Sequence, residues 1–171
     1  MPSRTDKIIS KGMEKAKAVK ATVKGIKGVF KTLMEQHGEV SGLLRRVQKN
    51  TDKRTELWPQ IRRELLSHER GELRVVFPVL RQFEETRHFA ERHDADAATL
   101  ESQIQTLDEE DIDSAAWGEQ FDTLVKLVTA HVNEEESEIF PAAMDVITGD
   151  RAEELDSQFM QAKKAAMADM A

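Results

Sequence analysis

The chain contains the pattern His-x-x-x-Glu-x-x-x-x-Phe-Pro twice, beginning at His68 and again at His131. The two carboxylates of the pattern are Glu72 and Glu135. Residues four apart in an α-helix lie on one face, one turn apart, so each copy points an imidazole and a carboxylate in the same direction. A repeated His/Glu pair is typical of a metal site, because each copy offers one nitrogen and one oxygen ligand.

Apolar residues at steps of three and four place both pairs on buried helix faces. The first stripe contains Ile61, Leu65, His68, Glu72, Val75 and Val79. The second contains Trp117, Phe121, Leu124, Val128, His131, Glu135 and Ala142. A buried carboxylate is costly unless it is paired, hydrogen-bonded or metal-bound. One copy alone is equally well explained by a buried ion pair, whereas two copies favour a metal site.

Two single histidines lie on apolar stripes of their own, His37 within residues 30–47 and His93 within residues 89–107. A lone histidine on an apolar face is usually an ordinary core residue. Here four such histidines divide the chain into two similar halves, each with one single histidine followed by one His/Glu pair. Such halves pack as an antiparallel four-helix bundle whose inner faces converge on one point.

This order of residues resembles the hemerythrin and hemerythrin-like (HHE cation-binding) family over roughly residues 30–145. The resemblance implies an all-α, up-down-up-down antiparallel four-helix bundle around a non-haem di-iron centre. The ligands that it implies are His37, His68, Glu72, His93, His131 and Glu135. In the family the two carboxylates bridge the irons, and one position stays open for dioxygen or a related ligand such as peroxide or nitric oxide. Only the resemblance selects iron, since zinc or manganese would suit the same donors.

The third helix departs from the family pattern. Blood hemerythrins carry two histidines four residues apart on this helix, whereas Phe89 stands four residues before His93. His88 is one candidate for the additional ligand, but five residues of helix turn it about 140° away from His93. It would reach the centre only if the helix began late or were distorted. Glu69, directly after His68, is the other candidate.

Composition excludes several other kinds of site. The chain has no cysteine, which excludes thiolate zinc sites, iron–sulfur clusters and disulfides. The Glu-x-x-His motif of ferritin-like proteins occurs only once, at Glu85, and the zincin motif is incomplete at His68. No apolar stretch approaches the length of a membrane span, and the N-terminus lacks the apolar region of a signal peptide. We therefore expect a cytoplasmic protein without a transmembrane segment.

We expect three segments, which are a basic amphipathic helical extension (1–28), the hemerythrin-like bundle (29–147) and a short C-terminal helix (148–171). Residues 1–31 carry a net charge of +7, so the remainder carries −14 of the total of −7. A basic amphipathic helix can bind a membrane surface, a nucleic acid or a protein. We favour packing on the acidic C-terminal helix or homo-oligomerisation and keep a protein partner as the alternative. We expect no nucleic acid, because no Arg-rich or aromatic pattern is present.

Local signals predict where the helices end. Pro78 and Pro141 each predict a kink or break just past a His/Glu pair, because proline cannot continue the hydrogen bonding of a helix. Asp113 or Ser114 is expected to cap the fourth helix of the bundle.

Two functions remain open from the sequence. One is a non-haem di-iron protein that binds or reduces dioxygen, peroxide or nitric oxide, as an oxygen-binding, sensing or detoxifying protein. Its ligand pocket is expected to be lined by Phe30, Leu33, Phe121 and Leu124. The other is an iron storage or sensing module without turnover that acts through a partner. The sequence leaves open whether the protein is an enzyme.

Overall fold

The computed structural model describes residues 25–170. The helices are α2 (Val29–Lys49), η2 (Thr51–Lys53), α3 (Arg54–Leu80), α4 (Glu84–Glu109), α5 (Ala115–Glu134), η3 (Glu135–Ile139), α6 (Phe140–Val146) and α7 (Gly149–Asp169). Within these residues there is no strand, so the prediction of an all-α protein is confirmed. Residues 1–24 of the predicted basic extension lie outside the described part of the chain.

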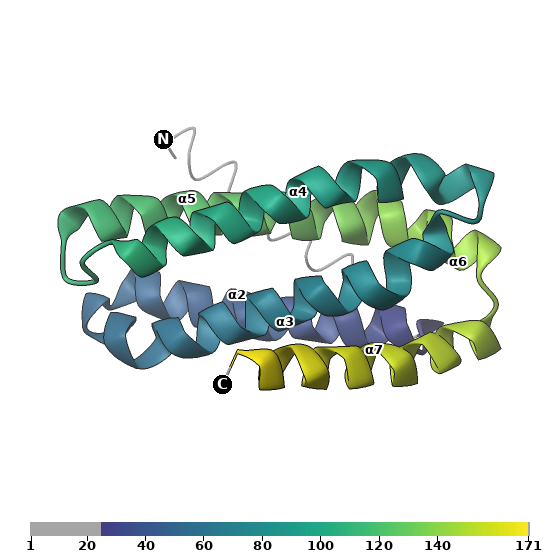
Figure 1. Ribbon diagram of the computed structural model, residues 1–171, viewed down its shortest axis with the longest axis horizontal. Helices are drawn as coiled ribbons and strands as arrows, with labels where there is room; N and C mark the ends of the chain where they lie inside the picture. Colours follow the sequence, from purple (N-terminus) through teal and green to yellow (C-terminus); the bar gives the residue numbers. More distant parts are fainter. Residues whose placement is uncertain (1–24, 171) are drawn as a thin grey trace, which may run out of the picture.

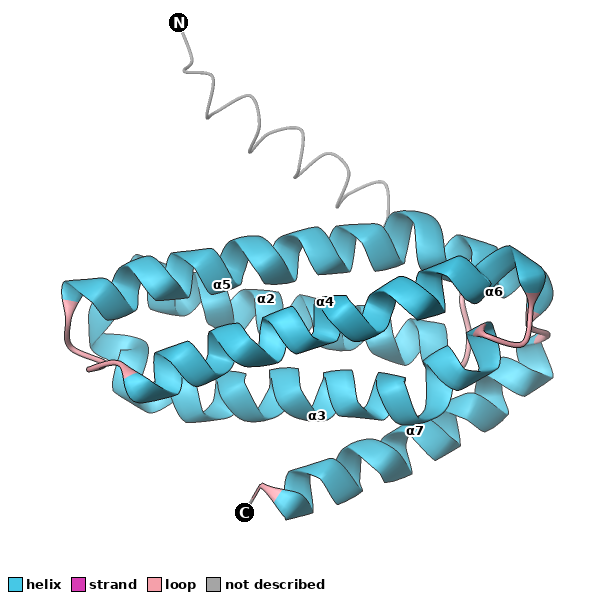
Figure 2. Cartoon of the chain, turned by 45° about the horizontal axis from the view of Figure 1, so that its top comes forward, coloured by secondary structure: helices cyan, strands magenta, loops and turns pink. Residues whose placement is uncertain are grey.

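The long helices lie side by side along the long axis of the molecule (Figure 1). The C-terminal helix α7 packs along α3 and α2 (Figure 2). With 21 residues it is as long as α2, rather than short as expected. Helix α5 begins where the sequence predicted. The Ser114 side chain accepts a hydrogen bond from the Trp117 N–H and caps the helix.

The two prolines have different effects on their helices. Helix α3 continues through Pro78 and ends two residues later, at Leu80. Before Pro141 the chain instead forms the π-helical turn η3, a common way to relieve a disturbed α-helix. A π-turn contains one more residue than an α-turn, so it advances the buried face by one position. Ala143 is therefore buried where the regular stripe predicted Ala142.

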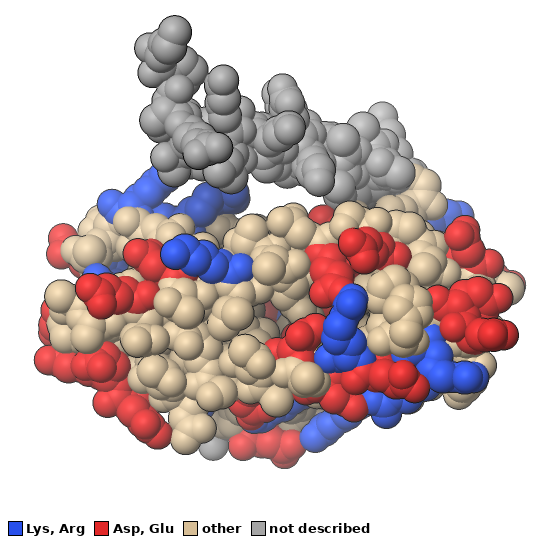
Figure 3. All heavy atoms as spheres, turned by 90° about the horizontal axis from the view of Figure 1, so that it is seen from above, with Lys and Arg blue, Asp and Glu red and all other residues tan. Residues whose placement is uncertain are grey.

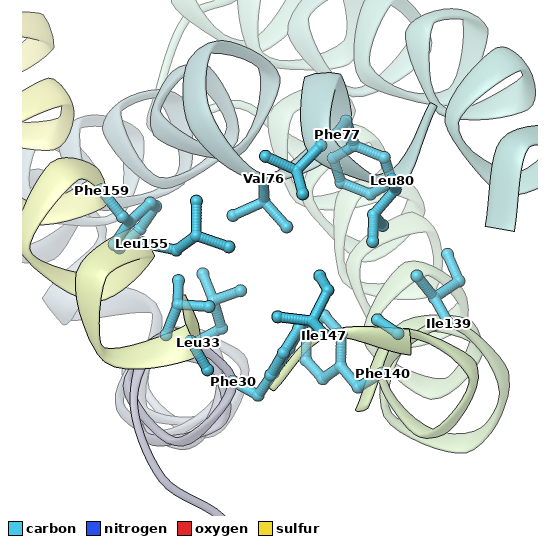
Figure 4. Packing of buried hydrophobic residues seen from close by; sticks show 14 of the residues in the cluster. Phe30, Leu33, Val76, Phe77, Leu80, Ile139, Phe140, Ile147, Leu155 and Phe159 are labelled. Atoms are coloured by element: carbon cyan, nitrogen blue, oxygen red, sulfur yellow. The ribbon is translucent and has the colours of Figure 1, made fainter. Parts of the chain in front are cut away.

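The buried apolar residues form two clusters. The Phe cluster includes Phe30, Leu33, Phe77, Phe140, Leu155 and Phe159 (Figure 4). The Trp cluster includes Trp58, Ile61, Trp117, Phe121 and Leu124. On α2, His37 lies between Leu33 of the Phe cluster and Val40, which packs in the Trp cluster. On the other helices of the bundle, too, buried polar residues stand between residues of the Phe cluster and residues of the Trp cluster. Together these polar residues form a buried polar layer between the two clusters.

Charged side chains are spread over the face of the molecule that Figure 3 shows. Acidic and basic side chains are distributed there among uncharged residues. None of the helices within residues 25–170 combines the length and the apolar character of a membrane span.

Candidate metal centre

The polar layer contains all six residues predicted as ligands, because each lies on the apolar stripe of its helix. Together with Glu69 they form two groups in which the ligand atoms lie within 4.8 Å of one another. The first group consists of His37, His68, Glu72 and Glu135. The second group consists of Glu69, Glu72, His93 and His131. All these side chains are buried except that of His131, which is partly exposed.

In the first group, α2, α3 and η3 bring four side chains around one point. The Nε2 atom of His37 lies 3.1 Å from Oε2 of Glu135. It also lies 3.2 Å from Nε2 of His68, which in turn is 3.5 Å from Oε1 of Glu72. These nitrogen and oxygen atoms thus converge from different helices.

In the second group, Glu69 lies between the two histidines. Its Oε1 atom is 2.7 Å from Nε2 of His93, and its Oε2 atom is 3.3 Å from Nε2 of His131. The ring of Phe77 stacks on that of His93, with centroids 3.5 Å apart, which fixes the plane of the imidazole.

Glu72 and Glu135 each reach both groups. Oε1 of Glu72 faces His68, and its Oε2 atom lies 4.0 Å from Nε2 of His93. Oε2 of Glu135 faces His37, and its Oε1 atom lies 3.0 Å from Nε2 of His131. Each carboxylate therefore has one oxygen on each side, which is the arrangement of a ligand shared between two closely spaced ions.

The residues of the site fit a metal by a further criterion. Seven of its buried atoms, among residues 25–170, have no hydrogen-bond partner, although several lie close together. They are Oε1 of Glu69, both carboxylate oxygens of Glu72 and of Glu135, and Nε2 of His93 and of His131. Buried polar atoms without partners are rare because each costs free energy. Metal ions would satisfy them, and imidazole with carboxylate suits iron, manganese or zinc.

Residues 28–143 match the model of the Hemerythrin HHE cation binding domain. The chain belongs to this hemerythrin family. No curated protein and no solved structure matched the chain. Family membership makes the bundle a cation-binding domain, and the two His/Glu groups are its candidate ligands.

The two candidates for an additional ligand lie in different places. Glu69 occupies the second group, beside His93. His88 is exposed and belongs to neither group among the described residues. Helix α4 begins at Glu84 and is regular through His93, so neither a late start nor a distortion brings His88 to the centre.

Protons balance the buried charges of this hemerythrin site when no metal is bound. Burial and the charges of Glu135 and Glu69 raise the pKa of Glu72 well above 4.5. Burial alone would lower the pKa of His131, but Glu135 and Glu69 outweigh it and raise this pKa to about 12. Burial likewise opposes ionisation of Glu135, but His131 and His37 keep its pKa well below the ordinary value. The metal-free site thus holds a neutral Glu72 and a cationic His131.

The two histidines of the first group have opposite shifts. Burial would lower the pKa of His37, but the carboxylates of Glu135 and Glu136 outweigh it and raise this pKa. Nδ1 of His37 donates to Oε1 of Glu136 at 2.9 Å. Burial and the neighbouring His37 lower the pKa of His68 to about 3, so that ring is neutral at pH 7. The sequence reasoning missed Glu136, although its place directly after Glu135 was a signal.

A small cavity adjoins both groups, bordered by His37, His68, Glu69 and His131 and by Lys163 of α7. The cavity offers about 20 Å³ to the centre of a water molecule, so it has room for one or two very small molecules. The expectation that Phe30, Leu33, Phe121 and Leu124 line this pocket was wrong. The first two belong to the Phe cluster and the last two to the Trp cluster, on opposite sides of the polar layer.

Proposed function

We propose that this chain is a non-haem di-iron protein in which α2–α5 form the up-down-up-down bundle of the family. His37 and His68 would hold one iron, and Glu69, His93 and His131 would hold the other. Glu72 and Glu135, with one oxygen toward each group, would contribute to both. The observation that carries this proposal is that each shared carboxylate has one oxygen facing each histidine pair.

We further propose dioxygen, peroxide or nitric oxide as the ligand. The cavity beside His37 and His68 admits only a very small molecule. Bound iron would supply the redox chemistry and the open coordination position.

The residues around the site have separate tasks in this proposal. Glu136 accepts a hydrogen bond from Nδ1–H of His37, which leaves the Nε2 lone pair free to bind metal. Val40, Leu65, Leu100 and Val128 give the cavity apolar walls that exclude bulk water. The segments are proposed to be a bundle over residues 29–147 and a C-terminal helix that covers it.

The test is anaerobic loading with ferrous iron, removal of excess, and optical spectra after adding dioxygen, peroxide or nitric oxide in separate samples. We expect a spectral change with at least one ligand in the wild type and none in His37→Ala, where the first group is incomplete. His88→Ala serves as the matched control, because this histidine is exposed. Bound iron without any response would instead support a storage or sensing module without turnover.

A further inference from the structure

Lys163 is a buried cation on α7, outside the segment that matches the family. Its Nζ atom donates to Oε2 of Glu64 at 2.7 Å and to Oε1 of Gln36 at 2.9 Å. Lysine is almost never fully buried without partners, and these two acceptors explain how this one is accommodated. The second of them leads directly to the metal site.

The Gln36 side chain lies between Lys163 and His68. Its Oε1 atom accepts from Lys163 and lies 2.9 Å from Nδ1 of His68. An ammonium group only donates, so the amide atom that faces Lys163 must be the oxygen. The amide nitrogen points instead to the sulfur of Met160, 3.8 Å away. Lys163 therefore determines which way round the amide of Gln36 is held.

The orientation of this amide determines where the proton of His68 lies. A carbonyl oxygen can only accept, so Nδ1 of His68 must carry the proton. The neutral ring has one ring proton, and Nε2 is left with its lone pair. That atom faces Glu72 and His37 within the first ligand group. If the amide were reversed, its NH2 group would favour the opposite tautomer, with the proton on Nε2.

We propose that Lys163 is a positioning residue that acts through Gln36 to hold His68 in the tautomer whose Nε2 can bind metal. The inference rests on the function proposed above, and it makes α7 part of the metal centre. Phe159, one helical turn before Lys163, supports the same ring, since it packs edge-on against His68 with centroids 5.9 Å apart. Gly71 leaves room for it, because a Cβ atom there would come within 2.6 Å of the Phe159 ring.

The competing role for Lys163 is to attach α7 to the bundle through Glu64. The two roles differ in what the variants do to the tautomer of His68 in the metal-free, full-length protein. Long-range ¹H–¹⁵N spectra assign the ring proton to Nδ1 or Nε2. We expect Nδ1–H in the wild type, in Glu64→Gln and in the exposed control Lys164→Met. We expect Lys163→Met to contain a large share of Nε2–H.

Rescue separates positioning from a general disturbance of the fold. Glutamate at position 36 has two acceptor oxygens and no NH2 group, so it needs no lysine to orient it. The double variant Gln36→Glu/Lys163→Met should therefore regain the Nδ1–H tautomer, whereas Gln36→Leu should lose it with Lys163 intact. Should Lys163→Met alone fail to fold, Gln36→Leu carries the same test.

Metal competition titrations give the second readout. Loss of a partner beyond the ligands typically costs about 10–100-fold in metal affinity. Lys163→Met should weaken one of the two metals by such a factor and leave the other nearly unchanged, with Lys164→Met behaving as wild type. Nε2–H in the wild type, or Nδ1–H retained in Lys163→Met and in Gln36→Leu, would overturn the proposal. A wild type with Nδ1–H that binds no metal would overturn the proposed function but not this tautomer assignment.

Discussion

Glu72 of α3 and Glu135 of η3 each direct one carboxylate oxygen to the first ligand group and the other oxygen to the second. Their protonation in the metal-free protein differs. Burial and neighbouring carboxylates favour a proton on Glu72, whereas His131 and His37 keep Glu135 ionised. The two carboxylates therefore have the same relation to the two ligand groups but differ in charge when no metal is present.

This difference predicts unequal effects of glutamine substitution. Glu72→Gln should leave the metal-free protein nearly as stable as wild type, because an amide resembles the protonated carboxyl. Glu135→Gln should lower the free energy of unfolding by about 3 kcal/mol, because it removes the partner of buried, cationic His131. Urea denaturation without metal measures both. Both variants should also bind metal much more weakly, and a Glu72→Gln protein that retained two metals would contradict its bridging role.

Glu69 and His88 provide a second comparison. Glu69→Gln should weaken the metal of the second group at least about 10-fold, since this carboxylate contacts both of its histidines. His88→Ala should leave metal affinity unchanged, because its side chain is exposed and outside both groups. Competition with a chromophoric chelator measures the affinities. The reverse ranking would show that α4 supplies the additional ligand after all.

Metal loading should release protons. In the metal-free site the raised pKa values of Glu72 and His37, and the pKa of about 12 of His131, favour protons on these ligands. Ligands bind metal in their deprotonated forms, so these protons must leave. Calorimetric titration in buffers of different ionisation enthalpy counts them. We expect at least one proton per chain at pH 7, and a heat of binding independent of the buffer would contradict this charge balance.

The stability of the metal-free protein should fall above about pH 6.5 and below about pH 4.5, because the raised pKa of Glu72 opposes the loss from His68 between these values. His131, with a pKa of about 12 folded against 6.5 unfolded, stabilises the fold fully below pH 6.5 and progressively less as the pH rises toward 12. His68, with a pKa of about 3 against 6.5, resists protonation in the fold, so stability is lost as the pH falls from 6.5 toward 3. Glu69, with a pKa of about 2 against 4.5, adds a loss below pH 4.5.

Chelation should therefore matter most above neutral pH. Metal at about 100 times its dissociation constant adds roughly 2.7 kcal/mol to the free energy of unfolding. Acid removes this gain, because protons compete for the ligands. Melting curves with and without chelator at pH 5, 7 and 9 should diverge as the pH rises. Coincident curves at pH 9, in a sample shown to have lost its metal, would contradict a stabilising role for the site.

The sequence predicted the helices well and indicated that His37, His68, Glu72, His93 and Glu135 would be buried, because apolar spacing reports which face of a helix is buried. That these residues bind metal stays a prediction. The sequence could not choose between Glu69 and His88, since the choice depends on how α3 and α4 face each other. The sequence also did not predict the π-turn that begins at Glu135, although Pro141 indicated a disturbance of the helix there. The spacing of residues along one helix likewise could not predict that Lys163 contacts Gln36, because the two residues lie on helices near opposite ends of the chain.

The most direct test of the account is the number of metal ions per chain. After anaerobic loading with ferrous iron and removal of excess, elemental analysis should give close to two irons per wild-type chain, as expected for two groups that share bridging carboxylates. A value near one would mean that the two groups act as a single mononuclear site. Less than about half an iron per chain would contradict the di-iron account and leave a cluster of buried ion pairs.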